Sequence, residues 1–201
     1  EVKNTKTGKS VKSETSLIGD GIQVKHPLNV FQFKDNRNSS CIVRWTVDYD
    51  GKARVFQPVV RFFYLERDKA NETEIPVLKY VDIEGDVYRN IGNNNQMQGD
   101  FSKSEFGAML KEKIGVDDSK QRLMADSVQI FIYAADENMS NYMSVSIPPT
   151  SIVQERPVFS NIDGGLGIFA SRRTKIKEKK SAPTSPTNDY RKFIESLGLE
   201  K

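Results

Sequence analysis

Hydrophobic and polar positions alternate along much of the chain, and this period of two predicts strands. The clearest example is the stretch CIVRWTVDYDGKARVFQPVVRFFYLE (residues 41–66), in which two strand-like runs flank Asp50-Gly51. Asp-Gly is a preferred pair for a two-residue hairpin turn, so the stretch predicts a β-hairpin. In that hairpin Trp45 would oppose Phe56 on the core face. Pro58 has no amide hydrogen to donate, which indicates an edge strand or a bulge.

Order is expected to begin near GIQVKHPLNVFQF, and four later segments also have strand-like patterns. These segments are IPVLKYVDIEG (75–85), SVQIFIYAAD (127–136), NYMSVSIPPTS (141–151) and LGIFAS (166–171). The second is largely apolar on both faces, which favours a strand in the middle of a sheet.

Helical spacing occurs in two places. In FSKSEFGAMLKEKIGV (101–116), Ser102 and Glu105 form a capping box, and Gly115 is placed to end the helix. In DYRKFIESLG (189–198), the apolar residues fall on one helical stripe. One short inserted helix and one terminal helix are therefore predicted.

Six or seven strands without regular βαβ alternation predict a mainly β protein, an antiparallel β-sandwich with one inserted short helix and a C-terminal helix. The predicted boundaries follow shifts in composition. They are a flexible lead-in at 1–16, a β-sandwich domain at 17–172, a basic and Ser/Pro linker at 173–188 and an amphipathic helix at 189–201.

Composition and charge restrict the classes of protein. The 201 residues carry a net charge of +3, and none of the apolar runs approaches the roughly 18 residues that a membrane-spanning helix needs. Because the chain starts with Glu, we expect a processed product whose targeting segment has been removed. Six Lys or Arg and one Glu lie in RRTKIKEKK (172–180), but aromatic residues are not interleaved with them, so no nucleic-acid partner is predicted.

Common catalytic and metal-binding sets are poorly represented. His26 is the only histidine and Cys41 the only cysteine, so neither a tetrahedral zinc site nor a disulfide framework is predicted. Cys41 falls on the same strand face as Trp45, which favours a small core residue over a nucleophile. We therefore predict no catalytic residues, no metal and no cofactor.

The stretch SNIDGGLGIFAS (160–171) raises the question of a phosphate-binding loop. A P-loop needs Lys-Ser/Thr after its last glycine, and a dinucleotide fingerprint needs a following helix. Neither is present here. We therefore predict a structural turn at Asp163, Gly164 and Gly165, with Gly167 marking a bulge or close packing in a strand.

The stretch VYRNIGNNNQMQGD (87–100) predicts a long exposed loop, and it is the best candidate for ligand binding. Amide side chains both donate and accept hydrogen bonds, which suits hydroxyl-rich or peptide ligands. The residues proposed to bind ligand are Tyr88, Arg89, Asn93, Asn94, Asn95 and Gln96. The alternative is an ordinary solvated loop.

Three segments resemble an uncharacterised family of extracytoplasmic lipoproteins from Bacteroidota. They are ARVFQPVVRFFYLERD (53–68), ADSVQIFIYAADENMSNY (125–142) and FSNIDGGLGIFASR (159–172), the last with the family's late Asn-Ile-x-Gly-Gly-x-Gly-Ile-Phe stretch. The resemblance implies a protein of the periplasm, outer membrane or cell surface beside an outer-membrane uptake complex. It also implies a lipid anchor as the only membrane attachment, although this chain shows no lipobox cysteine.

Together these features favour a non-enzymatic cell-envelope binding or accessory module for a glycan or peptide ligand. Two alternatives stay open. One is a glycan hydrolase or lyase that uses paired carboxylates, because acidic residues are plentiful. The other is a structural assembly component that pairs the strand near Gly167 with a partner strand.

Overall fold

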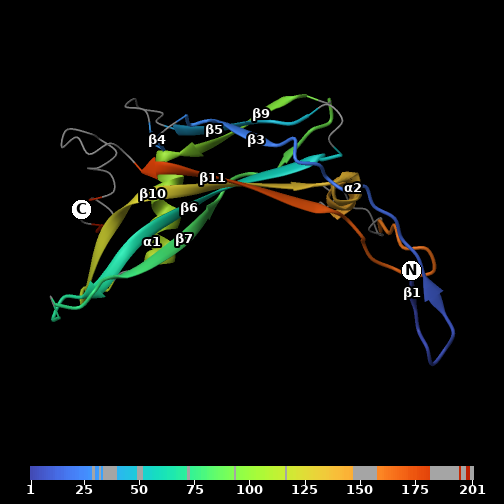
Figure 1. Ribbon diagram of the computed structural model, residues 1–201, viewed down its shortest axis with the longest axis horizontal. Helices are drawn as coiled ribbons and strands as arrows, with labels where there is room; N and C mark the ends of the chain where they lie inside the picture. Colours follow the sequence, from blue (N-terminus) through green and yellow to red (C-terminus); the bar gives the residue numbers. More distant parts are fainter. Residues whose placement is uncertain are drawn as a thin grey trace, which may run out of the picture.

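Two facing β-sheets form the body of the protein in this computed structural model (Figure 1). The structure describes residues 1–28, 30–31, 33, 40–48, 52–71, 73–92, 94–115, 117–146, 158–181, 195 and 198–199. The fold is mainly β, with antiparallel sheets in a sandwich-like arrangement, as the sequence predicts.

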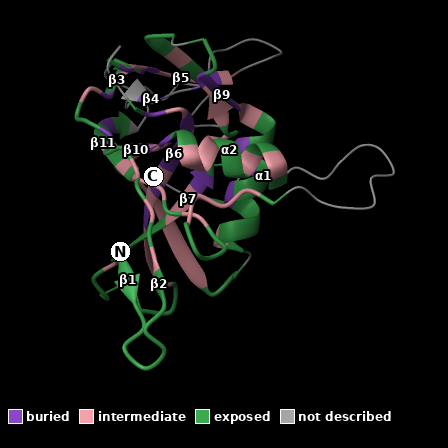
Figure 2. Ribbon diagram, turned by 90° about the vertical axis from the view of Figure 1, so that its right-hand side faces the viewer, coloured by how far each residue is buried: buried purple, intermediate pink, exposed green. Residues whose placement is uncertain are grey.

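The larger sheet has the strand order β4-β11-β10-β6-β7, with β8 also paired to β6. Its strands are β4 (Val30–Phe31), β6 (Val55–Asp68), β7 (Val77–Glu84), β8 (Tyr88–Arg89), β10 (Lys120–Ala135) and β11 (Arg172–Ser181). The smaller sheet has the order β3-β5-β9, formed by β3 (Gln23–His26), β5 (Ser40–Thr46) and β9 (Gln96–Ser102). A separate hairpin, β1 (Val2–Lys3) and β2 (Ser10–Val11), projects from the body and is largely exposed (Figure 2).

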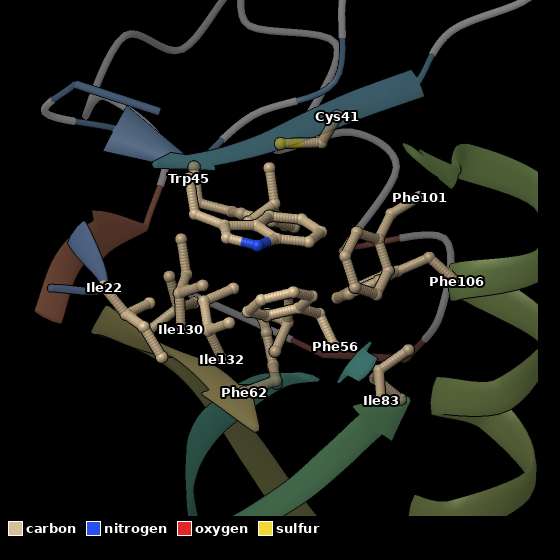
Figure 3. Close-up of a cluster of buried hydrophobic side chains, with 14 of the residues drawn as sticks. Ile22, Cys41, Trp45, Phe56, Phe62, Ile83, Phe101, Phe106, Ile130 and Ile132 are labelled. Carbon is tan, nitrogen blue, oxygen red and sulfur yellow. The ribbon is translucent and has the colours of Figure 1, made fainter. Parts of the chain in front are cut away.

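The hydrophobic core lies between the two sheets (Figure 3). Trp45 of β5 reaches down from the smaller sheet, and Phe56 and Phe62 of β6 and Ile130 of β10 rise from the larger one. Phe106 of helix α1 (Lys103–Ile114) closes one end of this core. All five side chains are at most 1% exposed, so one continuous apolar layer joins both sheets.

The predicted hairpin around Asp50-Gly51 is wrong, because β5 and β6 belong to different sheets. The turn itself lies outside the described residues. Trp45 pairs with Val24 and Met97 within its own sheet. It meets Phe56 across the core instead, with ring centroids 6.0 Å apart. The alternating pattern identifies which side chains face the core but does not identify the neighbouring strand.

Pro58 lies in β6, between β10 and β7, so of the two predicted alternatives, an edge strand or a bulge, the edge strand is wrong. Its carbonyl accepts a hydrogen bond from Gly85 N (2.9 Å) in the stretch between β7 and β8, where the ladder beside β6 is interrupted. In an antiparallel strand the N–H and C=O of one residue point to the same side. The amide hydrogen that Pro58 lacks would therefore point into this interruption of the ladder. A Cβ on Gly99 of the facing sheet would lie only 2.9 Å from the Pro58 ring, so glycine lets the two sheets approach there.

Several sequence predictions are confirmed. Residues 75–85 supply β7, and residues 127–135 of the predicted 127–136 lie in β10, which is central, between β11 and β6. Helix α1 begins and ends at the predicted residues: the Ser102 hydroxyl accepts the amide N–H of Glu105 (3.2 Å), which is one half of the predicted capping box, and Gly115 ends the helix with φ 72°.

Other predictions are corrected. Residues 141–146, predicted as part of a strand, belong to helix α2 (Glu137–Ser146), and residues 166–171 form a loop. Residues 173–181 form most of strand β11 instead of a linker, and the lead-in begins with the β1-β2 hairpin. Residues 182–188 lie outside the described residues, as does most of the predicted C-terminal helix, of which Leu199 is buried in the core.

The strands β6, β7 and β10 continue past the smaller sheet as a three-stranded arm (Figure 1). Near the end of β6, Glu66, with a side chain 11% exposed, accepts hydrogen bonds from Lys79 Nζ (2.5 Å) and Arg122 Nε (2.8 Å). Hydrogen bonds from Lys79 and then Arg122 hold the pKa of Glu66 below its ordinary value of 4.5. An ionised Glu66 of β6 therefore links its strand to both neighbours, β7 through Lys79 and β10 through Arg122.

We expect Glu66→Gln to destabilise the protein at pH 7, because Arg122 would lose its anionic partner in a 12% exposed position. A depressed carboxyl pKa gives stability that is present above pH 4.5 and lost as the pH falls through the folded-state pKa. The difference between wild type and variant should therefore be largest at pH 7 and shrink in acid. Urea unfolding at a series of pH values measures it, and a difference that grows below pH 4.5 would contradict the assignment.

Candidate functional site

A cleft of about 420 Å³ lies on the face of the larger sheet that points away from the core. Helix α2 lies over the sheet and forms the roof of the cleft, and strands β6, β7, β10 and β11 form the floor and the two ends of the cleft. The lining residues are Val55, Gln57, Val59, Asp82, Glu84, Val87, Tyr133, Ala134, Ala135, Met139, Met143 and Arg172. The volume is in the range of sites for small ligands or short peptide segments.

Asp136 positions the roof of the cleft. This residue is 2% exposed and follows directly after β10. Its Oδ1 accepts the amide N–H of Met139 (3.1 Å), which caps α2. Its Oδ2 accepts the amide N–H of Ser171 (3.1 Å) and the hydroxyl of Thr15. One buried carboxylate therefore ties together α2, the start of β11 and the N-terminal segment.

Helix α2 rests lightly on the sheet. None of its residues is buried, and Met139 and Met143, one turn apart, form its contribution to the cleft. Arg89 of β8 donates from Nη1 to the Ser144 hydroxyl (2.7 Å) near the other end of the helix. Methionine side chains adapt their shape to what they contact, so this roof can accommodate different apolar groups.

The two ends of the cleft carry opposite charges. At one end Asp82 and Glu84 project from the same face of β7. At the other end the guanidinium of Arg172 lies 4.2 Å from the centroid of the Tyr133 ring. The ring orients this cation without neutralising it. Between the charges the floor is mostly small and apolar.

Asp82 is strongly engaged by Arg61. The guanidinium donates to both carboxylate oxygens, at 2.7 and 2.9 Å, and lies over the rings of Tyr80 (4.0 Å) and Phe131 (4.7 Å). The hydrogen bond to Asp82 raises the pKa of Arg61, with burial acting against it. Glu84, by contrast, is exposed and forms no ion pair with any described residue, so it is the carboxylate available to a ligand.

The glycine-rich stretch is a closed loop instead of a strand. The Asn161 side chain accepts the amide N–H of Phe169 (2.8 Å) and donates to its carbonyl (2.7 Å), which pins the two ends together. Gly164 has φ 76° and Gly167 has φ 135°, conformations that favour glycine. The turn at Asp163, Gly164 and Gly165 is as predicted, whereas Gly167 lies in the loop and not in a strand.

The backbone of the N-terminal segment lies against this loop. Lys12 and Asp163 exchange two backbone hydrogen bonds, at 3.1 and 2.7 Å, and a Cβ on Gly164 would lie 3.1 Å from the carbonyl oxygen of Ser10. The loop is followed by β11 and not by a helix. Its glycines therefore admit polypeptide, which agrees with their interpretation as structural.

The five described residues among the six predicted to bind ligand do not form one site. Tyr88 packs its ring against Trp45 (5.8 Å), and burial is the main cause that raises its pKa. Arg89 contacts α2, as described above. Asn94 and Asn95 are exposed and serve structural roles through their backbones, and Gln96 begins β9. Asn93 lies outside the described residues.

The predicted long loop is also shorter than expected, because β8 and β9 occupy its two ends. Between them Asn90, 5% exposed, closes the turn: its side chain accepts the amide N–H of Asn94 and donates to the Asn94 carbonyl, both at 2.8 Å. Cys41 is 3% exposed in the core, as predicted. Within the described ranges, no group of three His, Cys, Asp or Glu residues is arranged to hold a metal ion.

The cleft was not predicted, because residues 141–146 of α2 were expected to form a strand and residues 173–181 of β11 a linker. A signal for α2 was present: Asp136 followed by Glu137, with Met139 and Met143 four residues apart, is a helix start with one apolar stripe. The pairing that brings Glu84 of β7 and Arg172 of β11 to one cleft joins distant segments, and no local pattern contains it.

Comparison with known proteins adds no relative: no family model matches the chain, and a search of curated proteins finds no match. Among the described helices, none is long and apolar enough to cross a membrane.

Proposed function

We propose that the protein is a non-enzymatic binding module of the bacterial cell envelope and that the cleft beneath α2 is its binding site. The observation that carries the proposal is a preformed cleft with an apolar middle and oppositely charged ends. The cell-envelope setting rests on the resemblance of the three segments described in the sequence analysis. An accessory role beside an outer-membrane uptake complex is part of the same proposal.

The geometry favours an extended peptide over a glycan. The pairing registers put Arg172 level with Val55 and Glu84 level with Val59, on strands three spacings apart. Their backbones are therefore roughly 19 Å apart, which about six residues of extended chain span. Sugar rings usually stack on exposed aromatic faces, but the Tyr133 ring is already covered by Arg172.

The expected ligand is a short segment with apolar side chains in its middle, a basic residue facing Glu84 and an acidic group facing Arg172. A peptide array and a glycan array, each probed with the intact chain, test this expectation. Peptides of that charge order should bind, and peptides with the order reversed should not. Binding confined to the glycan array would overturn the peptide assignment, and two blank arrays would overturn the binding module.

The matched experiment exchanges the charges of the cleft. In the double variant Glu84→Lys/Arg172→Glu we expect the preferred charge order of the bound peptides to reverse, with at least a tenfold loss for the original ligands. The control Asp118→Lys/Lys69→Glu makes the same charge changes at exposed turns distant in sequence from the cleft, and should bind as wild type. An equal loss in both variants would contradict a site in this cleft.

The carboxylates favour one second candidate, a glycan hydrolase or lyase. Asp82 and Glu84 line the same cleft two residues apart on one strand, which places their backbones about 6.7 Å apart. Two carboxyl groups separated by roughly 5 to 10 Å are what glycoside hydrolysis needs. Release of new reducing ends from a polysaccharide panel, abolished in Glu84→Gln, would establish the enzyme and overturn the binding module.

A further inference from the structure

Strand β11 carries a row of cations on the side that faces the smaller sheet. Arg173, Lys175, Lys177 and Lys179 pair in register with Ala134, Ile132, Ile130 and Val128 of β10, which are buried in the core. The four cations therefore point to the core side of the larger sheet, at positions where a sandwich normally places apolar residues. Because alternate residues of a strand are about 6.7 Å apart, the row is roughly 20 Å long.

The row lies at the margin of the sandwich, beside β3 (Figure 1). Only the last two residues of β11, Lys180 and Ser181, pair with β4, so among the described strands β11 has no second neighbour along Arg172–Lys179. Lys177 is exposed and Lys175 is half-buried. Lysines on an edge strand oppose pairing with other sheets, and here three lysines and one arginine lie on one face of the strand.

Carboxylates of the described residues neutralise only one end of the row. Arg173 forms an ion pair with Asp20, whereas Lys175, Lys177 and Lys179 have no carboxylate partner in the described part of the chain. Lys179, 8% exposed, donates to the carbonyl of Leu28. Burial and then the charge of Lys177 lower the pKa of Lys179, which indicates that the row repels itself.

We propose that the accessible part of the cationic row on β11, the exposed Lys177 and the half-buried Lys175, binds an anionic polysaccharide that lies along the strand. A linear polymer with repeated carboxylate or sulfate groups would relieve the repulsion between neighbouring lysines and would match a straight row of fixed charges. Single-stranded nucleic acid is less suited, because its bases need aromatic platforms and the row contains no aromatic side chain. This site is independent of the cleft beneath α2, so either proposal can fail alone.

The test measures binding of the full chain to polygalacturonate, to heparin and to single-stranded DNA of similar length, at a series of salt concentrations. We expect both polysaccharides to bind, with affinity that falls steeply as salt rises. Lys175→Glu/Lys177→Glu should reduce the affinity at least tenfold. Binding to polygalacturonate alone or heparin alone would identify the anionic group and support the proposal.

The matched control is Lys3→Glu/Lys6→Glu in the N-terminal segment, which changes the net charge equally at exposed positions away from β11. It should retain wild-type affinity. Because reversing a charge near the core can prevent folding, Lys175→Gln/Lys177→Gln is measured as well, and it should fold and bind more weakly than wild type. Equal losses in the control, or DNA bound more tightly than either polysaccharide, would overturn the proposal.

Discussion

Replacement of Asp136 by alanine is expected to lower the free energy of unfolding by about 3 kcal/mol. Its carboxylate is buried and accepts hydrogen bonds from the amide of Met139, the amide of Ser171 and the hydroxyl of Thr15. Loss of a helix cap costs about 1 kcal/mol, and an unsatisfied buried amide costs roughly 1 to 3 more. Urea unfolding measures the loss, and hydrogen exchange should show faster exchange at Met139 and Ser171.

The consequence should extend to ligand binding, because Asp136 holds the helix that forms the roof of the cleft. At a temperature where the variant is still folded, we expect weaker binding of any ligand of the cleft, while binding of polysaccharide to β11 is reduced less. Asp118→Ala, at an exposed turn, is the control and should be within about 0.5 kcal/mol of wild type. A loss at Asp136 as small as at Asp118 would contradict its role as a buried cap.

The residues of the core could be read from the sequence, but their pairing could not. Alternation correctly places Trp45 and Phe56 on core-facing sides, because burial of one face is a local property of a strand. The partner of a strand depends on the whole chain. The Asp50-Gly51 pair suggested a hairpin, whereas β5 pairs with β3 and β9 and meets β6 across the core.

The candidate site depended on two segments with misleading composition. Residues 141–146 contain Val, Tyr and Met, which are compatible with a strand, but the buried cap at Asp136 makes them helical. Residues 173–181 are so rich in lysine that they suggested a linker, yet they pair with β10 over most of their length. Tertiary contacts outweigh local preference in both segments.

The glycine loop shows the opposite case, in which local chemistry was sufficient. The absence of a Lys-Ser/Thr pair after Gly167 argued against phosphate, and the structure places backbone of the N-terminal segment against Gly164. What the sequence did not show is how the loop closes. The two hydrogen bonds between the Asn161 side chain and Phe169 join residues eight apart, with no secondary structure between them to indicate the contact.

Trp45→Ala should have the largest effect on stability, a loss of about 4 kcal/mol in the free energy of unfolding. The indole is fully buried and packs against Phe56 and Tyr88, so its removal would leave a cavity between the two sheets. Trp45→Phe should cost much less. The indole N–H has no hydrogen-bond partner among the described residues. Removing this unsatisfied buried donor offsets part of the free energy that is lost with the packing of the larger ring.

Thermal and urea unfolding of both variants, with Tyr142→Ala as a control at a 41% exposed aromatic residue, measure this difference. Trp45 belongs to the smaller sheet, whereas Phe56 and Tyr88, which it contacts, belong to the larger one. If the two sheets form one cooperative unit, both should unfold in a single transition in every variant. A second transition in Trp45→Ala would show that the sheets are stable separately. A loss no greater than that of Tyr142→Ala would place the indole outside the core and contradict the packing of the two sheets.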